Sequence, residues 1–459
     1  MAVFFRDVEI AGVEHVPRDA PLLIVSNHTN ALIDPLLLLG HLPVHARLLA
    51  KSTLWDLKLL APLLRLGAAI PVFRRQDAAF DAQGEQHTAR NEGMFAHCHE
   101  VLASGGSIAL FPEGISHNEP KLMPLKTGVA RIALEAEIKY PNLGIRIVPV
   151  GLIFDARTRF RSRALLQVGE PIDPTPELDR YRRDPRQAVS RLTARVAANL
   201  SEITPNYTSW EEARLAQRAA EIIANDPLED PRGELPLSKH AALSKALFDG
   251  YRLMREREPL RVAHVYDRVK SYDHLLRVFR LRSRQITSSY GWAGAAGFTL
   301  HSLAVLVIRL PLTLIGIVLN YLPYRVIGVV AMRKGDGDND IAATYKVLGG
   351  FFLFPLTWSV EAVVAAWLGG LAFGGLVLVL APATAWIAMR SHDRRRHLYA
   401  EARAFLLLRN NRRIAEELGR RRDEIVVEIE ALAARLRRDA PTASSDARAR
   451  WAASPDATP

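Results

Sequence analysis

The feature that most restricts how this chain can fold is a long apolar tract in its last third. Residues 347–389 contain one charged side chain, Glu361, and glycine pairs at 369–370 and 374–375. A helix needs about 20 apolar residues to cross a bilayer. The tract is therefore long enough for two spans that turn near Gly369–Gly370.

A second apolar stretch, residues 302–332, is interrupted by Arg309-Leu310-Pro311 and again near Asn320 and Pro323. It is too long for one span and short for two, so a re-entrant segment is one interpretation. A pair of buried helices in a soluble core is the alternative. Basic residues favour the cytoplasmic side of a membrane, and two hairpins would put three Arg-containing segments there: 277–284, 333–336 and 390–397. These features predict an integral protein of the inner, cytoplasmic membrane with its amino-terminal domain on the cytoplasmic side.

Residues 1–175 alternate short apolar runs with helical patterns, which predicts an α/β domain with a mainly parallel sheet and flanking helices. The expected strands are 20–28, 67–73, 106–114 and 145–154, and the expected helices are 35–42, 54–65, 84–103 and 126–140.

The rest of the chain reads as largely helical. We expect a helical, basic extension at 176–298 with a linker near 225–236, and a transmembrane region at 299–389 made of two hairpins or about three segments. A cytoplasmic amphipathic helix at 390–438 and a disordered tail at 439–459 would follow.

The net charge of +11 favours anionic partners such as an anionic lipid surface. Nucleic acid is disfavoured because the basic runs lack interleaved aromatic residues. The only cysteine, Cys98, excludes an intrachain disulfide. The first 17 residues lack the pattern of a secretory signal.

The stretch "IVSNHTNALIDP" (24–35) ends an apolar run with His28 and places Asp34 six positions later. A histidine can take a proton near neutral pH, and a carboxylate on its other nitrogen would hold the ring in place. The two can meet only if a loop lies between strand and helix. The alternative for Asp34-Pro35 is a helix start, with Asp34 as N-cap.

Two further strand ends carry polar residues. "FPEG" (111–114) places Glu113 and Gly114 on a turn, and "IPVFRRQD" (70–77) carries Arg74 and Arg75, which suit phosphate. Because ligands bind at the carboxyl ends of parallel strands, these residues are expected to share a crevice with His28. Ser116 and His117 are interpreted as turn residues, with Ser116 in reach of substrate. No metal site is expected, since "AHCHE" (96–100) is best interpreted as a solvated helix surface.

Taken in order, "NHTNALIDP", "IPVFRR", "FPEGISH" and "IVPVGL" resemble the four sequence blocks of the glycerolphosphate acyltransferase family over roughly residues 1–175. The closest likeness is to the bacterial and fungal branch that acylates glycerol 3-phosphate or dihydroxyacetone phosphate. The commonest family form has four residues between the histidine and the aspartate, whereas this chain has five.

The resemblance implies roles for individual residues. His28 would be the general base and Asp34 would orient it. Arg74 would bind the acceptor phosphate, with Arg75 a second candidate, Glu113 and Gly114 would help to hold the acceptor, and Pro149 would belong to the block that lines the acyl-chain side. Backbone N–H groups after His28 or near Gly114 are candidates for stabilising the oxyanion.

The sequence therefore predicts an O-acyltransferase of phospholipid synthesis. It would move a fatty acyl group from acyl-CoA or acyl carrier protein to glycerol 3-phosphate or dihydroxyacetone phosphate, without a cofactor. Lysophosphatidate as the acceptor is the first alternative, and a non-catalytic lipid-binding membrane protein is the second.

Overall fold

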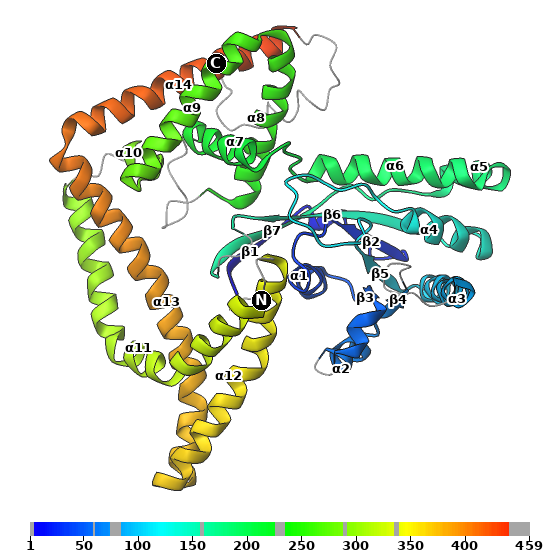
Figure 1. The fold of residues 1–459 in the computed structure, drawn as a ribbon, viewed down its shortest axis with the longest axis horizontal. Coiled ribbons are helices and arrows are strands. Elements are labelled where there is room, and N and C mark those ends of the chain that lie inside the picture. The colour runs from blue at the N-terminus through cyan, green and yellow to red at the C-terminus, as the bar shows by residue number, and fades with distance from the viewer. Residues whose placement is uncertain are drawn as a thin grey trace. The chain divides into compact units, whose positions relative to one another are not determined.

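The computed structural model describes residues 4–57, 60–73, 84–156, 160–224, 235–287, 292–334 and 339–439. The chain divides into two compact units, which are Met1–Asn206 with Ala331–Val347, and Tyr207–Val330 with Leu348–Pro459. The elements of both units are labelled in Figure 1. Each unit is described separately below.

The first unit contains a seven-stranded sheet in the order β1-β7-β6-β2-β5-β3-β4. Five strands, β6, β2, β5, β3 and β4, run parallel to one another, while β7 pairs antiparallel with β6 and parallel with β1. The predicted mainly parallel sheet is thus confirmed. The strands are β1 (Phe5–Ala11), β2 (Leu22–Ser26), β3 (Ala46–Lys51), β4 (Ile70–Val72), β5 (Ser107–Leu110), β6 (Arg146–Phe154) and β7 (Ser162–Val168).

Helices cover both faces of this sheet, because successive side chains of a strand point to opposite faces. On β2, Leu22 and Ile24 pack in one core cluster with α1. Leu23 and Val25 pack in another with α3, α4 and α6. The helices of this unit are α1 (Ile33–His41), α2 (Ala61–Leu66), α3 (Gly84–Ala103), α4 (Gly128–Lys139), α5 (Leu178–Arg183) and α6 (Pro185–Ile203).

Three strands lie where the sequence suggested none. β1 reads FRDVEIA, β3 reads ARLLAK and β7 reads SRALLQV. Each carries at least one charged side chain, which interrupts the apolar run that marks a buried strand. β1 also lies at an edge of the sheet, where one side needs no strand partner.

The predicted solvated surface at 96–100 is wrong for two of its residues. Cys98 is completely buried and His99 is 7% exposed on α3. Burial raises the pKa of the Cys98 thiol to about 12, so the thiol stays protonated and unreactive at neutral pH. Burial likewise lowers the pKa of His99, whose Nε2 lies 3.7 Å from Glu135.

The second unit is helical in the residues that the structure describes. α7, α8, α9 and α14 pack together, and Leu215, Val265 and Ile425 belong to one of their shared clusters. The helices are α7 (Trp210–Ile223), α8 (Leu237–Arg257), α9 (Pro259–Phe279), α10 (Arg284–Thr287), α11 (Trp292–Lys334), α12 (Asn339–Gly369), α13 (Leu371–Asn410) and α14 (Arg412–Asp439). The end of α11 from residue 331 and the start of α12 up to residue 347 belong to the first unit. α13 continues without a break through residues 389–390, where the sequence suggested a boundary.

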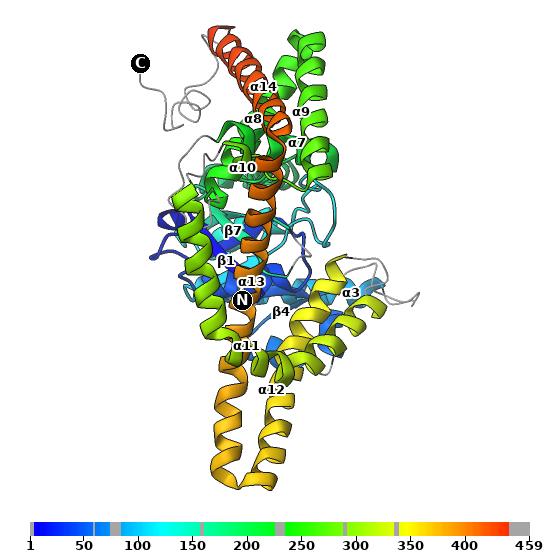
Figure 2. The ribbon, with the colours of Figure 1, turned by 90° about the vertical axis from the view of Figure 1, so that its left-hand side faces the viewer.

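Three helices among the described residues are long and apolar enough to cross a membrane, over Leu303–Arg333, Thr344–Gly369 and Leu371–Asn410. α12 and α13 form a hairpin that is visible from two directions (Figure 1, Figure 2). They are separated at Gly370, whose φ of 85° suits glycine. α11 contains Pro311 and Pro323, and Figure 1 shows that it changes direction along its length.

A polar contact joins these three helices. Asn320 of α11 is 9% exposed, and its Oδ1 accepts a hydrogen bond of 2.8 Å from Trp358 Nε1 of α12. Its Nδ2 donates to the carbonyl oxygen of Ala381 on α13 at 3.5 Å. A Cβ on Gly316 would lie 2.2 Å from the Thr384 carbonyl oxygen, so only glycine permits this approach of α11 to α13.

Candidate active site

The site begins where β2 ends, at Asn27. The Asn27 side chain donates from Nδ2 to the Leu152 carbonyl oxygen at 3.0 Å and accepts from the Leu152 N–H at 2.7 Å. Since Ser26 is the last β2 residue paired with β6, the amide of Asn27 continues that ladder with side-chain atoms. This contact fixes the backbone immediately before His28.

His28 and Asp34 are in contact, as predicted from the sequence. His28 Nδ1 lies 3.0 Å from Asp34 Oδ2. The same oxygen accepts the backbone N–H groups of Thr29 and Asn30, each at 2.7 Å. The Asp34 side chain is fully buried. The loop between β2 and α1 therefore wraps around one carboxylate oxygen and absorbs the fifth intervening residue.

This arrangement determines what the imidazole can do. Asp34 Oδ2 accepts two backbone N–H groups, so it acts as an acceptor toward His28 as well, and Nδ1 carries the proton. Nε2 then has its lone pair available to accept a proton. The ring stacks on Phe111 with centroids 4.1 Å apart and planes at 15°, which fixes its orientation.

The alternative interpretation, in which Asp34 is the N-cap of the following helix, is wrong. α1 starts at Ile33 with Leu32 as N-cap, and Asp34 lies in the first turn. Its carboxylate instead binds N–H groups of the preceding loop, which an acidic residue in a first turn can reach.

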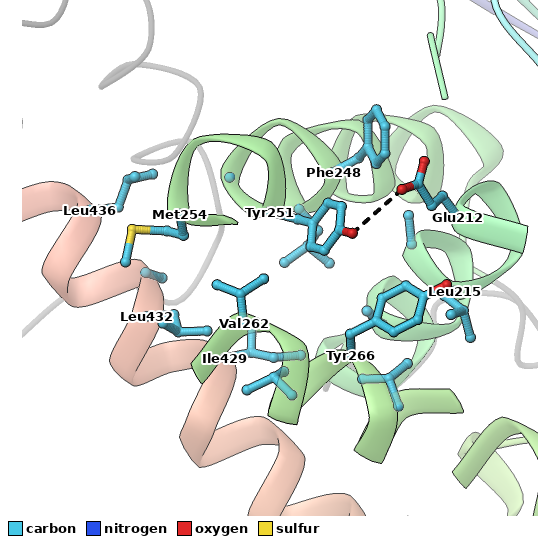
Figure 3. Close-up of a pocket in the computed structure, with 17 residues that line it drawn as sticks. Glu212, Leu215, Phe248, Tyr251, Met254, Val262, Tyr266, Ile429, Leu432 and Leu436 are labelled. Carbon is cyan, nitrogen blue, oxygen red and sulfur yellow. Dashed lines mark hydrogen bonds between the residues drawn. The ribbon is translucent and has the colours of Figure 1, made fainter. Parts of the chain in front are cut away.

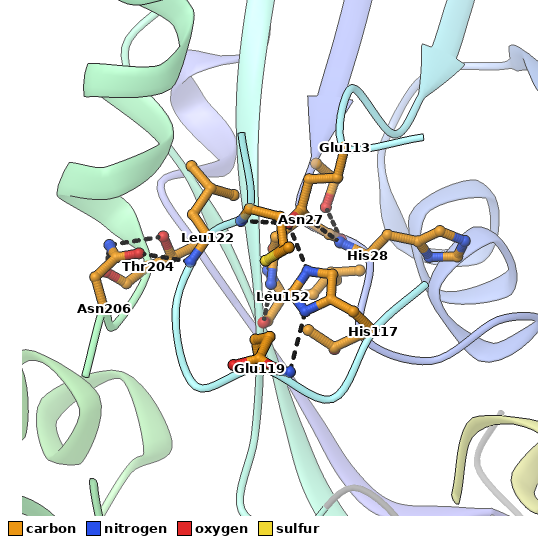
Figure 4. Close-up of polar contacts among 12 residues, drawn as sticks. Asn27, His28, Glu113, His117, Glu119, Leu122, Leu152, Thr204 and Asn206 are labelled. Carbon is orange, nitrogen blue, oxygen red and sulfur yellow. Dashed lines mark hydrogen bonds and ion pairs between the residues drawn. The ribbon is translucent and has the colours of Figure 1, made fainter. Parts of the chain in front are cut away.

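Glu113 ties the loop after β5 to the loop after β2 (Figure 4). Its Oε1 accepts the backbone N–H of His28 at 2.8 Å. Its Oε2 accepts the N–H of Met123 at 2.7 Å and also contacts His117 Nε2. Because its side chain has no exposed surface, Glu113 acts in this structure on the position of the loops.

His117 completes the connection between the two loops. Its backbone N–H donates to the His28 carbonyl oxygen at 3.2 Å. Its Nδ1 accepts the Glu119 N–H at 3.1 Å, so Nε2 is the donor to Glu113. The N–H and the C=O of His28 are thus both bound by the segment that follows β5.

Only two of the remaining predicted residues lie in the loop that carries Glu113. Gly114 follows Glu113 with φ of 76°, and Ser116 is half-buried in the same loop. Pro149 is buried on β6, paired with Val25 of β2 rather than with the loop that carries His28. Arg74 and Arg75 lie outside the described residues.

Four backbone N–H groups in the region of the predicted oxyanion donors already have partners within the protein. The N–H of His28 donates to Glu113, those of Thr29 and Asn30 donate to Asp34, and that of Gly114 donates to Phe111 O at 3.0 Å. None of these four groups is available to an oxyanion in this conformation. Other backbone N–H groups after His28 or near Gly114 therefore stay the predicted donors.

Sequence reasoning did not assign a site role to Asn27, Phe111, His117 or Lys126. A Cβ on Gly114 would lie 2.6 Å from Lys126 Nζ, so an ammonium group lies over the "FPEG" turn. The spacing of Glu113 and His117, four positions apart beside a Pro/Gly turn, was the available signal for their pairing. No comparable signal marked Phe111 or Lys126.

Two known protein families match parts of this chain. Residues 7–153 match the family described as Acyltransferase. Residues 228–438 match the family described as Glycerol-3-phosphate acyltransferase 2 C-terminal domain.

Individual relatives cover parts of the chain. Glycerol-3-phosphate O-acyltransferase 2 of Saccharomyces cerevisiae is 31% identical over 45% of this chain and 26% of its own length. Glycerol-3-phosphate O-acyltransferase 1 of the same yeast is 28% identical over 57% of this chain and 36% of its own. The matched regions thus span about a third or less of these two yeast proteins. The crystal structure of a 1-acyl-sn-glycerophosphate acyltransferase from Thermotoga maritima matches 43% of this chain and 73% of its own, with 21% identity and a TM-score of 0.30.

Proposed function

We propose that this chain, which joins an acyltransferase domain to a glycerol-3-phosphate acyltransferase 2 C-terminal domain, transfers a fatty acyl group from a thioester to glycerol 3-phosphate. The observation that carries the proposal is the contact between His28 Nδ1 and Asp34 Oδ2, which leaves Nε2 as a base at the carboxyl end of β2. The names of the two yeast relatives support glycerol 3-phosphate as the acceptor.

In the proposed reaction, His28 Nε2 removes the proton of the acceptor hydroxyl while its oxygen attacks the thioester carbonyl. Asp34 stabilises the imidazolium that forms. The C–S bond then breaks, and the proton passes from His28 to the leaving thiolate. A thiol is far more acidic than an alcohol, so the thiolate leaves readily. Neither a metal nor a covalent enzyme intermediate is needed for these steps.

Cationic residues would bind the phosphate of the acceptor. Arg74 is the first candidate and Arg75 the second, as the family resemblance implies. Lys126 adds an ammonium group beside Gly114. Glu113, Gly114 and Ser116 would shape the acceptor side of the site, and Pro149 the acyl-chain side.

The test is a panel of acceptors and donors with the full chain in lipid nanodiscs. Glycerol 3-phosphate, dihydroxyacetone phosphate and lysophosphatidate are each offered with acyl-CoA and with acyl carrier protein. We expect kcat/KM for glycerol 3-phosphate to exceed that for lysophosphatidate by at least about tenfold, a discrimination of ~1.4 kcal/mol. A preference for lysophosphatidate would make lysophosphatidate the acceptor. An absence of transfer from both donors would contradict the proposed enzymatic function.

The proposal includes a membrane arrangement. A span of 31 residues is about 46 Å long as a straight helix, well above the ~30 Å of a bilayer core. A bent α11 that enters and leaves on one face resolves this mismatch. With the α12–α13 hairpin, it brings Arg282, Arg333 and Arg395 to one side, together with the acyltransferase domain. Each basic residue there would gain ~1 kcal/mol from anionic lipid.

Cysteine labelling tests this arrangement. Single substitutions Arg282→Cys, Arg333→Cys and Arg395→Cys are expected to react with a membrane-impermeant maleimide from the cytoplasmic side. Leu371→Cys, at the 88%-exposed residue after the α12–α13 turn, should react from the other side. The unsubstituted chain is the control, because buried Cys98 should stay unlabelled. Opposite labelling of Arg282→Cys and Arg333→Cys would mean that α11 crosses the membrane.

A further inference from the structure

The peptide of His28 takes part in a closed cycle of three hydrogen bonds (Figure 4). The His28 N–H donates to Glu113 Oε1 at 2.8 Å. The imidazole of His117 donates from Nε2 to Glu113 Oε2, and the His117 N–H donates to the His28 carbonyl oxygen at 3.2 Å. Two of the three bonds depend on side chains, those of Glu113 and His117, so loss of either side chain opens the cycle.

The position of this peptide matters for the proposed base. Asp34 and Phe111 orient the imidazole of His28, Asp34 through Nδ1 at 3.0 Å and Phe111 by stacking. The place from which the side chain starts is set by the backbone. A general base acts only within hydrogen-bond reach of its proton, and a misplacement of about 1 Å can cost about 10²-fold in rate.

Glu113 depends on its donors to hold that backbone. Its side chain has no exposed surface, and its carboxylate accepts N–H groups from His28, Met123 and the imidazole of His117. A buried carboxylate that loses one of its donors is destabilised where it stands. The His117 side chain is itself only 8% exposed, so its Nε2–H points into the protein at Glu113.

The loop that carries His117 has anchors besides this imidazole. The Leu122 N–H donates to Asn206 Oδ1 at 2.9 Å (Figure 4), and the Met123 N–H donates to Glu113 Oε2 at 2.7 Å. Both bonds use backbone donors of the loop. Removal of the imidazole should therefore weaken the hold on Glu113 while the loop keeps its path.

We propose that His117 is a positioning residue for the reaction. It holds the carboxylate of Glu113, and Glu113 holds the peptide of His28 so that Nε2 lies within reach of the acceptor hydroxyl. This inference rests on the proposed function. Because Nε2 of His117 is engaged by Glu113, His117 acts on kcat and not on the affinity for glycerol 3-phosphate.

The experiment measures kcat and KM for glycerol 3-phosphate at saturating donor, with the full chain in lipid nanodiscs. His117→Phe keeps an aromatic ring and removes the donor to Glu113, with His117→Leu as a substitute if the first fails to fold. We expect kcat to fall about 10–100-fold, with KM within about twofold of the parent. His117→Gln, whose amide can donate to Glu113, should restore kcat to within about fivefold of the parent.

Hydrogen–deuterium exchange gives a second measurement that needs no turnover. Exchange of the peptide that contains His28 should be faster in His117→Phe, because the His28 N–H loses its fixed acceptor. Tyr251→Phe is the matched control. It also removes a side-chain donor to a glutamate, Glu212 at 3.4 Å, in the second unit on the wall of a pocket between α7, α8, α9 and α14 (Figure 3). Its kcat and its exchange around His28 should equal those of the parent.

A double variant tests whether His117 acts through His28. The His28→Ala/His117→Phe protein should be no slower than His28→Ala alone, since a base that is absent cannot be misplaced. A loss equal to the product of the two single losses would overturn the proposal.

Three further results would also overturn it. The first is a raised KM with parental kcat in His117→Phe, which would make His117 an acceptor-binding residue. The second is a His117→Gln protein as slow as His117→Phe, and the third is faster exchange around His28 with parental kcat. An absence of acyl transfer in the parent, together with the expected exchange pattern, would contradict the proposed enzymatic function and still support the hold of His117 on the His28 peptide.

Discussion

Replacing His28 with alanine is expected to lower kcat for acyl transfer by about 10²–10⁴-fold, the range typical of a lost general base. The structure supplies the reason, because Nε2 is the ring nitrogen that remains after Nδ1 binds Asp34. The fold should persist, since the backbone groups of His28, rather than its ring, hold the two loops together through Glu113 and His117. The measurement is kcat and KM for glycerol 3-phosphate at saturating donor.

His41→Ala is a matched control for this variant. His41 lies at the end of α1, where its Nδ1 contacts only the Leu37 carbonyl oxygen in the hydrogen bonds described. Its activity should equal that of the parent. A folded His28→Ala protein with parental kcat would remove the proposed base and with it the mechanism.

Replacing Asp34 with asparagine is expected to lower both activity and stability. An amide keeps an acceptor oxygen for Thr29 and Asn30 but loses the negative charge that stabilises the imidazolium, so kcat should fall by about 10²–10⁴-fold. The two backbone hydrogen bonds and the ring contact all become neutral at a fully buried position, which should cost about 2–4 kcal/mol of unfolding free energy.

The double variant makes this prediction sharper. Because Asp34 acts on the reaction through His28, the His28→Ala/Asp34→Asn protein should be no slower than His28→Ala alone. Its melting temperature should still show the part of the Asp34→Asn loss that comes from the contacts with Thr29 and Asn30, since these do not involve the ring. If the loss in kcat of the double variant equalled the product of the two single losses, Asp34 would contribute to the reaction independently of His28.

The parts of the fold that were predictable are those with strong local patterns. The strand that ends at Ser26 and the strand before Phe111 are unbroken apolar runs, and parallel strands align their carboxyl ends at one edge. That alone brings His28 and Glu113 together, 85 positions apart in sequence. The paired glycines at 369–370 likewise interrupt a helix where backbone freedom permits a turn.

The contacts that could not be predicted depend on which hydrogen-bond donor lies next to each acceptor in the folded chain. A carboxylate can serve a substrate, a side chain or a backbone N–H, and the sequence does not distinguish these. Glu113 is the clearest case, because its two oxygens bind His28, Met123 and His117 from separate loops. The pairing of β1 with β7 was not predicted for a related reason. Charged residues interrupt the apolar pattern of both strands, although the strands pair through their backbone atoms.

The contacts of Glu113 and His117 with the peptide of His28 have a consequence for synthesis of the protein. A nascent chain already contains both members of the dyad by residue 34, but the groups that anchor the histidine emerge from the ribosome only with residues 113–117. We therefore expect the proposed base to acquire its geometry only when β5 docks beside β2, a step that closes a long loop. Before that contact forms, a nascent chain would hold both residues of the proposed site without the anchor that positions them.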